Sequence, residues 1–245
     1  MGFSNLQRNF LVRLKIKCSK ENRLLLRILG GNKKRIEKRV IGLAGLCAGA
    51  GTTHLSLMTG NYLANGLGIK VAVILLGEDN TFNELVKYVD YQYNEGISGS
   101  EKRNKIRSNL LLKYHGLTFN GMDIYKCNRS GTWQIFKDYY DYLILDFSST
   151  NEKKIAMPDF MACNKKILVS SMTPYKLREC IERTTRIKRM LEGELIWVSQ
   201  TYNLNQAKKL EKDLEVIIKV IPNEPDLIRI DGKHLKWLDE LVFAQ

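Results

Sequence analysis

The most constraining feature of this sequence is a series of short, almost entirely apolar runs that alternate with segments of helical spacing. Three of these runs are VAVILL at 71–76, YLILDF at 142–147 and LIWVS at 195–199. A strand that is apolar at every position must be buried on both faces, which is typical of parallel sheets covered by helices. The sequence therefore predicts an α/β fold in which a mostly parallel sheet lies between two layers of helices.

The same reading places the individual elements. Strands are expected at 39–45, 71–76, 117–125, 142–147, 166–170, 195–199 and 216–221, and helices at 53–67, 81–89, 133–140, 174–191, 205–213 and 234–242. The stretch 90–108 is polar and contains glycine and serine, so it is expected to be a mobile loop.

Composition limits the functional classes. The chain has 245 residues, 44% of them hydrophobic, which suffices for a large core without metals or disulfides. The five cysteines are scattered and show no CxxC spacing, so neither a zinc site nor a disulfide framework is expected. No apolar run reaches the length of a membrane span, and basic residues interrupt every candidate signal sequence. We expect a cytoplasmic protein with reduced thiols.

The positive charge is concentrated at the N-terminus. The net charge is +13, and residues 1–39 hold twelve lysines and arginines against two glutamates. We therefore divide the chain into a basic amphipathic arm, residues 1–38, and a domain, residues 39–245. The arm could pack on its own domain, contact an anionic membrane surface or a protein partner, or, as the less favoured alternative, bind nucleic acid.

The most specific motif is VIGLAGLCAGAGTTHL at 40–55, where an apolar strand enters a glycine-rich turn and a helix follows. Glycines allow successive backbone amides to turn toward an anion, and the start of a helix adds its positive dipole end. The candidate phosphate-binding residues are Gly49, Ala50, Gly51, Thr52, Thr53 and His54. The alternatives are a tight packing turn for the loop and a capping role for His54.

The motif departs from the phosphate-loop pattern G-x-x-x-x-G-K-[ST]. The first glycine position of the pattern is Leu46, the lysine position is Thr52, and the hydroxyl position is Thr53. A loop of this kind keeps its backbone amides but lacks the ammonium that neutralises the terminal phosphates.

The order of segments over 39–242 resembles the MinD/ParA-type branch of P-loop ATPases. The family's loop K-G-G-x-G-K-T-T matches residues 47–54, with Cys47 and Thr52 at its two lysine positions. The resemblance implies ATP or ADP bound with Mg²⁺, which Thr53 and Asp146 would hold. Asp146 ends the strand DYLILD, where its alternative role is to cap a strand–loop junction.

Two further positions are implied by the resemblance alone. The loop VIPNEPDL, with Pro222, resembles the segment that covers the adenine base, and Gln200 lies near the family's base-reading asparagine. The family's switch aspartate is missing at the end of the second strand, where Glu78 and Asp79 are the nearest acids. The resemblance therefore implies weak or absent ATPase activity.

Three functions stay open. The first is a nucleotide-binding or pseudo-ATPase localisation factor acting on a protein partner, similar to the TadZ/CpaE-type proteins that mark pilus or secretion assembly sites. The second is an ATP-dependent homodimer switch whose lysine comes from the arm or from a second subunit. The third is a nucleic-acid binder that uses the arm.

Overall fold

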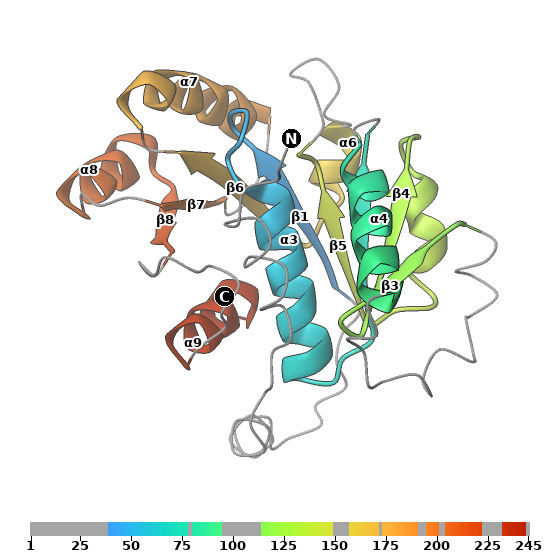
Figure 1. The fold of residues 1–245 in the computed structure, drawn as a ribbon. Coiled ribbons are helices and arrows are strands. Elements are labelled where there is room, and N and C mark those ends of the chain that lie inside the picture. Colours follow the sequence, from blue (N-terminus) through green and yellow to red (C-terminus); the bar gives the residue numbers. More distant parts are fainter. Residues whose placement is uncertain are drawn as a thin grey trace, which may run out of the picture.

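An eight-stranded sheet forms the centre of the computed structural model (Figure 1). The structure describes residues 39–77, 80–94, 114–148, 157–171, 173–190, 195–200, 204–221 and 232–243. The strands are β1 (Arg39–Gly45), β2 (Val71–Leu76), β3 (Leu117–Phe119), β4 (Met122–Cys127), β5 (Tyr142–Asp146), β6 (Lys165–Ser171), β7 (Ile196–Gln200) and β8 (Ile217–Val220). Their order is β3-β4-β2-β5-β1-β6-β7-β8, and every neighbouring pair is parallel except β3 with β4. The predicted α/β fold with a mostly parallel sheet is confirmed.

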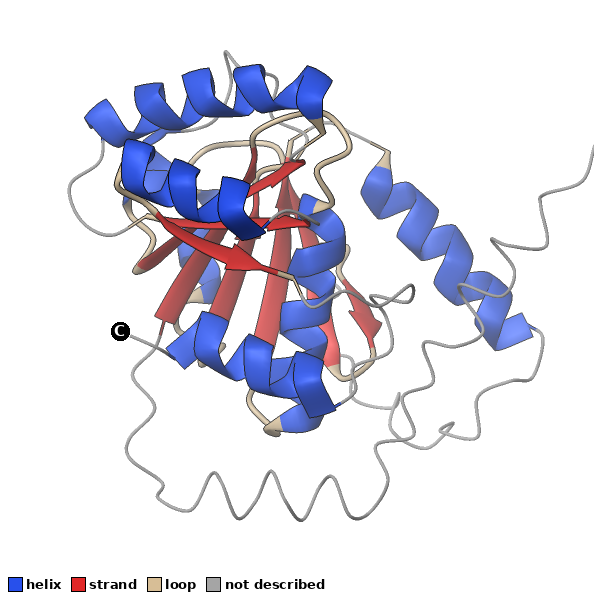
Figure 2. Ribbon diagram, turned by 90° about the vertical axis from the view of Figure 1, so that its left-hand side faces the viewer, coloured by secondary structure: helices blue, strands red, loops and turns tan. Residues whose placement is uncertain are grey.

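Helices cover both faces of the sheet (Figure 2). On one face lie α3 (Thr52–Asn61) with its π-helical continuation η1 (Tyr62–Gly66), α4 (Thr81–Asn94) and α9 (Gly232–Phe243). On the other lie the 3-10 helix η2 (Thr132–Phe136), α6 (Met157–Met161) and α7 (Pro174–Met190). The helix α8 (Leu204–Leu214) packs beside α7 and β8 at one edge. The result is a three-layer arrangement.

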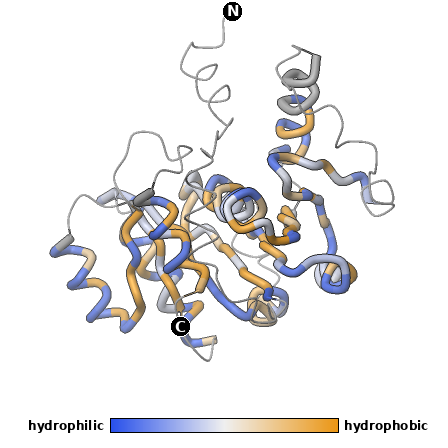
Figure 3. Tube along the Cα trace, turned by 90° about the horizontal axis from the view of Figure 1, so that it is seen from below, coloured by the Kyte–Doolittle hydropathy of each residue, from blue (hydrophilic) through white to orange (hydrophobic). Residues whose placement is uncertain are grey.

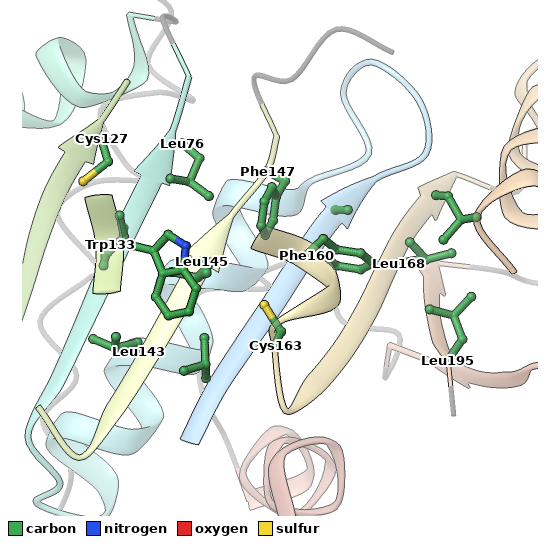
Figure 4. Packing of buried hydrophobic residues seen from close by; sticks show 14 of the residues in the cluster. Leu76, Cys127, Trp133, Leu143, Leu145, Phe147, Phe160, Cys163, Leu168 and Leu195 are labelled. Carbon is green, nitrogen blue, oxygen red and sulfur yellow. The ribbon is translucent and has the colours of Figure 1, made fainter. Parts of the chain in front are cut away.

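The strand residues alternate between the two cores that these layers enclose. In β1, Val40 and Ala44 belong to the core under α7, whereas Ile41 and Leu43 belong to the core under α3. Apolar stretches accordingly run through the body of the trace (Figure 3). In the core under α7, the rings of Phe147 and Phe160 meet edge to face at 5.3 Å between centroids (Figure 4). Burial on both faces explains why these strands need no polar positions.

The structure differs from the predicted elements in several places. The single strand expected at 117–125 is the hairpin β3–β4, because Asn120 and Gly121 both adopt positive φ and turn the chain. The helix α4 extends to Asn94, into the stretch expected to be a loop from residue 90. The short helix α6 was not predicted. Its buried Asp159 accepts hydrogen bonds from Gly131 N and Trp133 Nε1, which fix it against η2.

Some predictions lie outside the described residues. These are the basic arm at 1–38, the rest of the loop up to residue 108, and Pro222. The division of the chain at residue 38 therefore stays a prediction. Among the described residues, no helix is long and apolar enough to cross a membrane.

Candidate functional site

The carboxyl ends of β5, β1, β6 and β7 meet at one edge of the sheet. The parallel register pairs Leu43 of β1 with Asp146 of β5, and Ser171 of β6 with Gln200 of β7. The loop after β1 lies at the same edge, in blue beside the start of α7 (Figure 1). The fold thus brings the sequence-predicted loop, Asp146 and Gln200 to the edge where open α/β sheets bind ligands.

The loop between β1 and α3 has the backbone of an anion cradle. Gly49 and Gly51 have φ of 69° and 86°, in the left-handed region that favours glycine. Gly51 caps α3 without a side chain, and a Cβ there would meet no atom of the described residues within 4 Å. The first-turn amides of α3, those of Thr52, Thr53 and His54, have no acceptor within their own helix. Their dipole favours a negative ligand, so the loop fits a phosphate group.

Thr52, at the pattern's lysine position, packs below the loop. Its side chain is 3% exposed, and its Oγ1 lies 2.8 Å from where a Cβ on Gly45 would stand. The hydroxyl therefore occupies space that only a glycine at residue 45 leaves open. Thr52 anchors the start of α3 to β1 and presents no charge to the loop.

Two hydrogen bonds made by Ser148 connect the start of α3 with the end of β5. Thr53 Oγ1 and Ser148 Oγ lie 2.8 Å apart, and the amide of Ser148 donates to Asp146 Oδ1 at 2.8 Å. Asp146 is buried, while Ser148 is exposed. Hydroxyl and carboxylate oxygens beside a phosphate cradle are the donor set that Mg²⁺ prefers. The residues present therefore fit a magnesium-bound nucleotide, with Thr53 and Asp146 as the residues that would hold the ion.

Two residues of this site were missed by sequence reasoning. Ser148 could have been noticed, because a hydroxyl two residues after a strand-ending aspartate is well placed to join it. Lys176, in the first turn of α7, donates from Nζ to the loop carbonyl of Ala48 at 2.7 Å. No local pattern could connect Lys176 with Ala48, since they are 128 positions apart in the sequence.

The structure describes some of the remaining predicted residues but not all of them. His54 is the third residue of α3 and is half-buried. Gln200 ends β7, two strands away from β1. Pro222, Glu78 and Asp79 lie outside the described residues, so the predicted base-binding pair and the switch acids stay predictions.

Thiols lie behind the loop. Cys47, at the family's first lysine position, and Cys180 of α7 are both buried and free. Burial, followed by the neighbouring Cys47 thiol, raises the pKa of Cys180 from 9.0 to about 12. The Cys180 thiol is therefore protonated at neutral pH, and the two buried side chains pack between the loop and α7.

Comparison with known proteins identifies the fold. No family model matches the chain, and no curated protein sequence matches it. A ParA family ATPase from Chlorobium tepidum TLS is 12% identical, with a TM-score of 0.52 over 85% of this chain and 94% of that one. MinD in the MinC:MinD cell division protein complex of Aquifex aeolicus is 17% identical, with a TM-score of 0.54 over 82% of this chain and 92% of that one.

A third similar structure contains a bound ligand. It is a putative plasmid partition protein from Borrelia burgdorferi B31 bound to AMPPNP, which is 14% identical with a TM-score of 0.53 over 84% of this chain and 97% of that one. At such identities the likeness defines the fold. The chain therefore has the P-loop NTPase-like fold of ParA- and MinD-type ATPases.

Proposed function

We propose that this chain is a nucleotide-binding protein with weak or no ATPase activity that localises or regulates a protein partner. The observation that carries the proposal is the glycine cradle at the start of α3, joined through Thr53 and Ser148 to the buried Asp146. The ligand would be ATP or ADP with Mg²⁺. The Borrelia structure bound to AMPPNP, which has the same fold, supports this choice.

The expectation of weak hydrolysis rests on the loop itself. Cys47 and Thr52 stand where the resembled family's loop has lysines, and both residues are buried. Loss of a group that stabilises charge in the transition state costs on the order of 10²-fold or more in rate. The nucleotide would then act as a bound effector that sets the conformation seen by the partner.

The partner is proposed to be a protein, and the finer assignment is a factor for pilus or secretion assembly of the TadZ/CpaE type. The MinC:MinD complex supports a protein partner, since it is an assembly made by a protein of this fold. Contact with a membrane surface through the basic residues 1–38 would agree with the charge concentrated there.

A second candidate is an active ATP-dependent dimerisation switch with an ammonium supplied from outside the loop. The contact of Lys176 with the loop favours this candidate over binding of nucleic acid through the arm. Nucleic-acid binding by the arm predicts an affinity that falls steeply with salt and is lost on deletion of residues 1–38.

Binding and phosphate release measured on the same preparation separate these functions. The proposal predicts saturable binding of MgATP with marginal phosphate release and no change of sedimentation with nucleotide. Fast turnover that Asp146→Ala abolishes, together with ATP-driven dimerisation, would replace it with the switch. Absence of binding for both ATP and ADP would exclude both.

A further inference from the structure

We propose that Lys176 of α7 is the phosphate-binding cation of this loop and supplies, for nucleotide binding, a positive charge that residues 47 and 52 lack. The inference deepens the proposed function and rests on it. It assigns the positive charge to a residue outside the glycine motif, on a helix that comes later in the chain.

The contacts place the ammonium directly at the cradle. Lys176 Nζ donates to Ala48 O at 2.7 Å and lies 3.8 Å from where a Cβ on Gly49 would stand. An ammonium has three donors, and the bond to Ala48 uses one of them. The charge is thus held against the segment whose amides and helix dipole favour an anion.

The start of α7 holds this lysine in a defined position. Thr173 precedes the helix and Pro174 opens it, a combination that favours helix initiation. The carbonyl of Thr173 accepts from the amides of Lys176 and Leu177 at 2.9 and 3.0 Å. On the inner side, buried Cys180 donates to Ser171 O at 3.7 Å. The side chain therefore extends from a rigid backbone at the carboxyl end of β6.

The position is electrostatically unfavourable for an isolated helix. A cation in the first turn opposes the helix dipole, and the first turn of α7 contains no acidic residue. In the described part of the chain, the ammonium is stabilised by the carbonyl of Ala48 and lies 5.8 Å from the ring centre of Tyr175. An anion bound in the loop would interact favourably with the positive dipole ends of α3 and α7 and with the Lys176 ammonium at the same time. The arrangement is what a polyphosphate ligand would need.

This assignment has a specific consequence for ligand choice. The gain from an ammonium grows with the phosphate charge that it meets, so Lys176 should matter for ATP and ADP and little for AMP. Binding would also join α7 to the loop through a charge-assisted contact.

The test is a titration of the full chain with MgATP, MgADP and AMP, using Lys176→Ala, Lys176→Gln and Lys176→Arg. The matched control is Arg178→Ala, because Arg178 lies on the same helix, is 90% exposed in its side chain and pairs with Glu182. Loss of a charge-assisted hydrogen bond predicts about 10- to 100-fold weaker MgATP binding for the two neutral variants. AMP binding should change less than about twofold, Lys176→Arg should recover part of the affinity, and Arg178→Ala should resemble the wild type.

A second readout covers variants that fold poorly. Acetylation of lysines in the wild-type chain, mapped by mass spectrometry, should fall at Lys176 when MgATP is present and stay constant at the exposed Lys212 of α8. Equal MgATP affinity in wild type and Lys176→Gln, or equal losses in Lys176→Gln and Arg178→Ala, would overturn the inference while leaving the proposed function intact. A wild type that binds none of the three nucleotides would overturn both.

Discussion

At the scale of single residues, the candidate site combines a glycine-rich loop with a cysteine and a threonine at residues 47 and 52. The glycines at 49 and 51 keep left-handed backbone that a side chain would strain. Thr52, at one lysine position of the family pattern, packs against Gly45. Cys47, at the other lysine position, packs against Cys180. The chemistry proposed for this chain is therefore anion binding by amides and by the ammonium of Lys176, beside one carboxylate and two hydroxyls.

A residue-scale prediction concerns Asp146. Asp146→Asn keeps the shape of the side chain but removes the charge that Mg²⁺ would meet. We expect the ratio of ATP affinities with and without Mg²⁺ to fall by about tenfold or more, whereas binding of ATP in the presence of a chelator stays within about threefold.

The control for Asp146 is Asp213→Asn, since Asp213 is an exposed carboxylate on α8. Calorimetric titration of each variant, with the thermal midpoint of the free protein as a check on folding, decides the matter. An unchanged magnesium dependence in Asp146→Asn would assign this aspartate to strand capping.

At the scale of elements, a polar network joins the hairpin β3–β4 to the segment that precedes β5. Tyr140 donates to Asp123 Oδ2 at 2.6 Å, its hydroxyl lies 2.6 Å from that of Tyr125, and Thr118 donates to Asp123 Oδ1 at 2.7 Å. Burial, followed by hydrogen bonds to Asp123 and Tyr125, raises the pKa of Tyr140. The network helps to fix the position of β3, because an edge strand of only three residues forms few hydrogen bonds of its own.

Tyr140→Phe should lower the free energy of unfolding by about 1–3 kcal/mol, because it removes the two hydrogen bonds that the buried Tyr140 hydroxyl makes with Asp123 Oδ2 and Tyr125. Urea titration of the full chain measures the change. Tyr139→Phe is the matched control, since Tyr139 is 51% exposed and should stay within about 0.5 kcal/mol of the wild type. Equal effects of the two changes would mean that the network contributes nothing.

At the scale of the whole molecule, buried thiols tie stability to pH. Burial raises the pKa of Cys163 and Cys180 from 9.0 to about 12, and that of Cys127 to about 11. Above pH 9 the unfolded chain loses these thiol protons while the folded chain retains them. The thiol contribution to stability is therefore complete below about pH 8 and is lost as pH rises toward 11 and 12.

Each such thiol should lower the free energy of unfolding by about 1.4 kcal/mol per pH unit in this range. Urea titrations at intervals between pH 8 and 11 measure the slope. Cys163→Ser should reduce the slope of the free energy of unfolding against pH by the contribution of one thiol, because serine does not titrate in this pH range. An identical slope in the variant would show that this thiol does not couple to folding.

The sequence and the structure agree where one local pattern decides an element. Uniformly apolar runs such as VAVILL predicted buried parallel strands, and the glycine-rich turn predicted the start of α3 within one residue. The hairpin was missed because Asn120-Gly121 lies inside a stretch that reads as one strand. Lys176 was missed because its meeting with Ala48 depends on the position of β6 beside β1, which no local pattern contains.

The most direct measurement is the thermal unfolding of the full chain with and without MgATP. A ligand that binds only the folded state adds about 2.7 kcal/mol of stability at 100 times its dissociation constant. The account predicts a stabilisation of this size that follows the ligand concentration, with little accompanying phosphate release. A thermal midpoint that is unchanged by ATP and ADP over the full range of concentrations would contradict it.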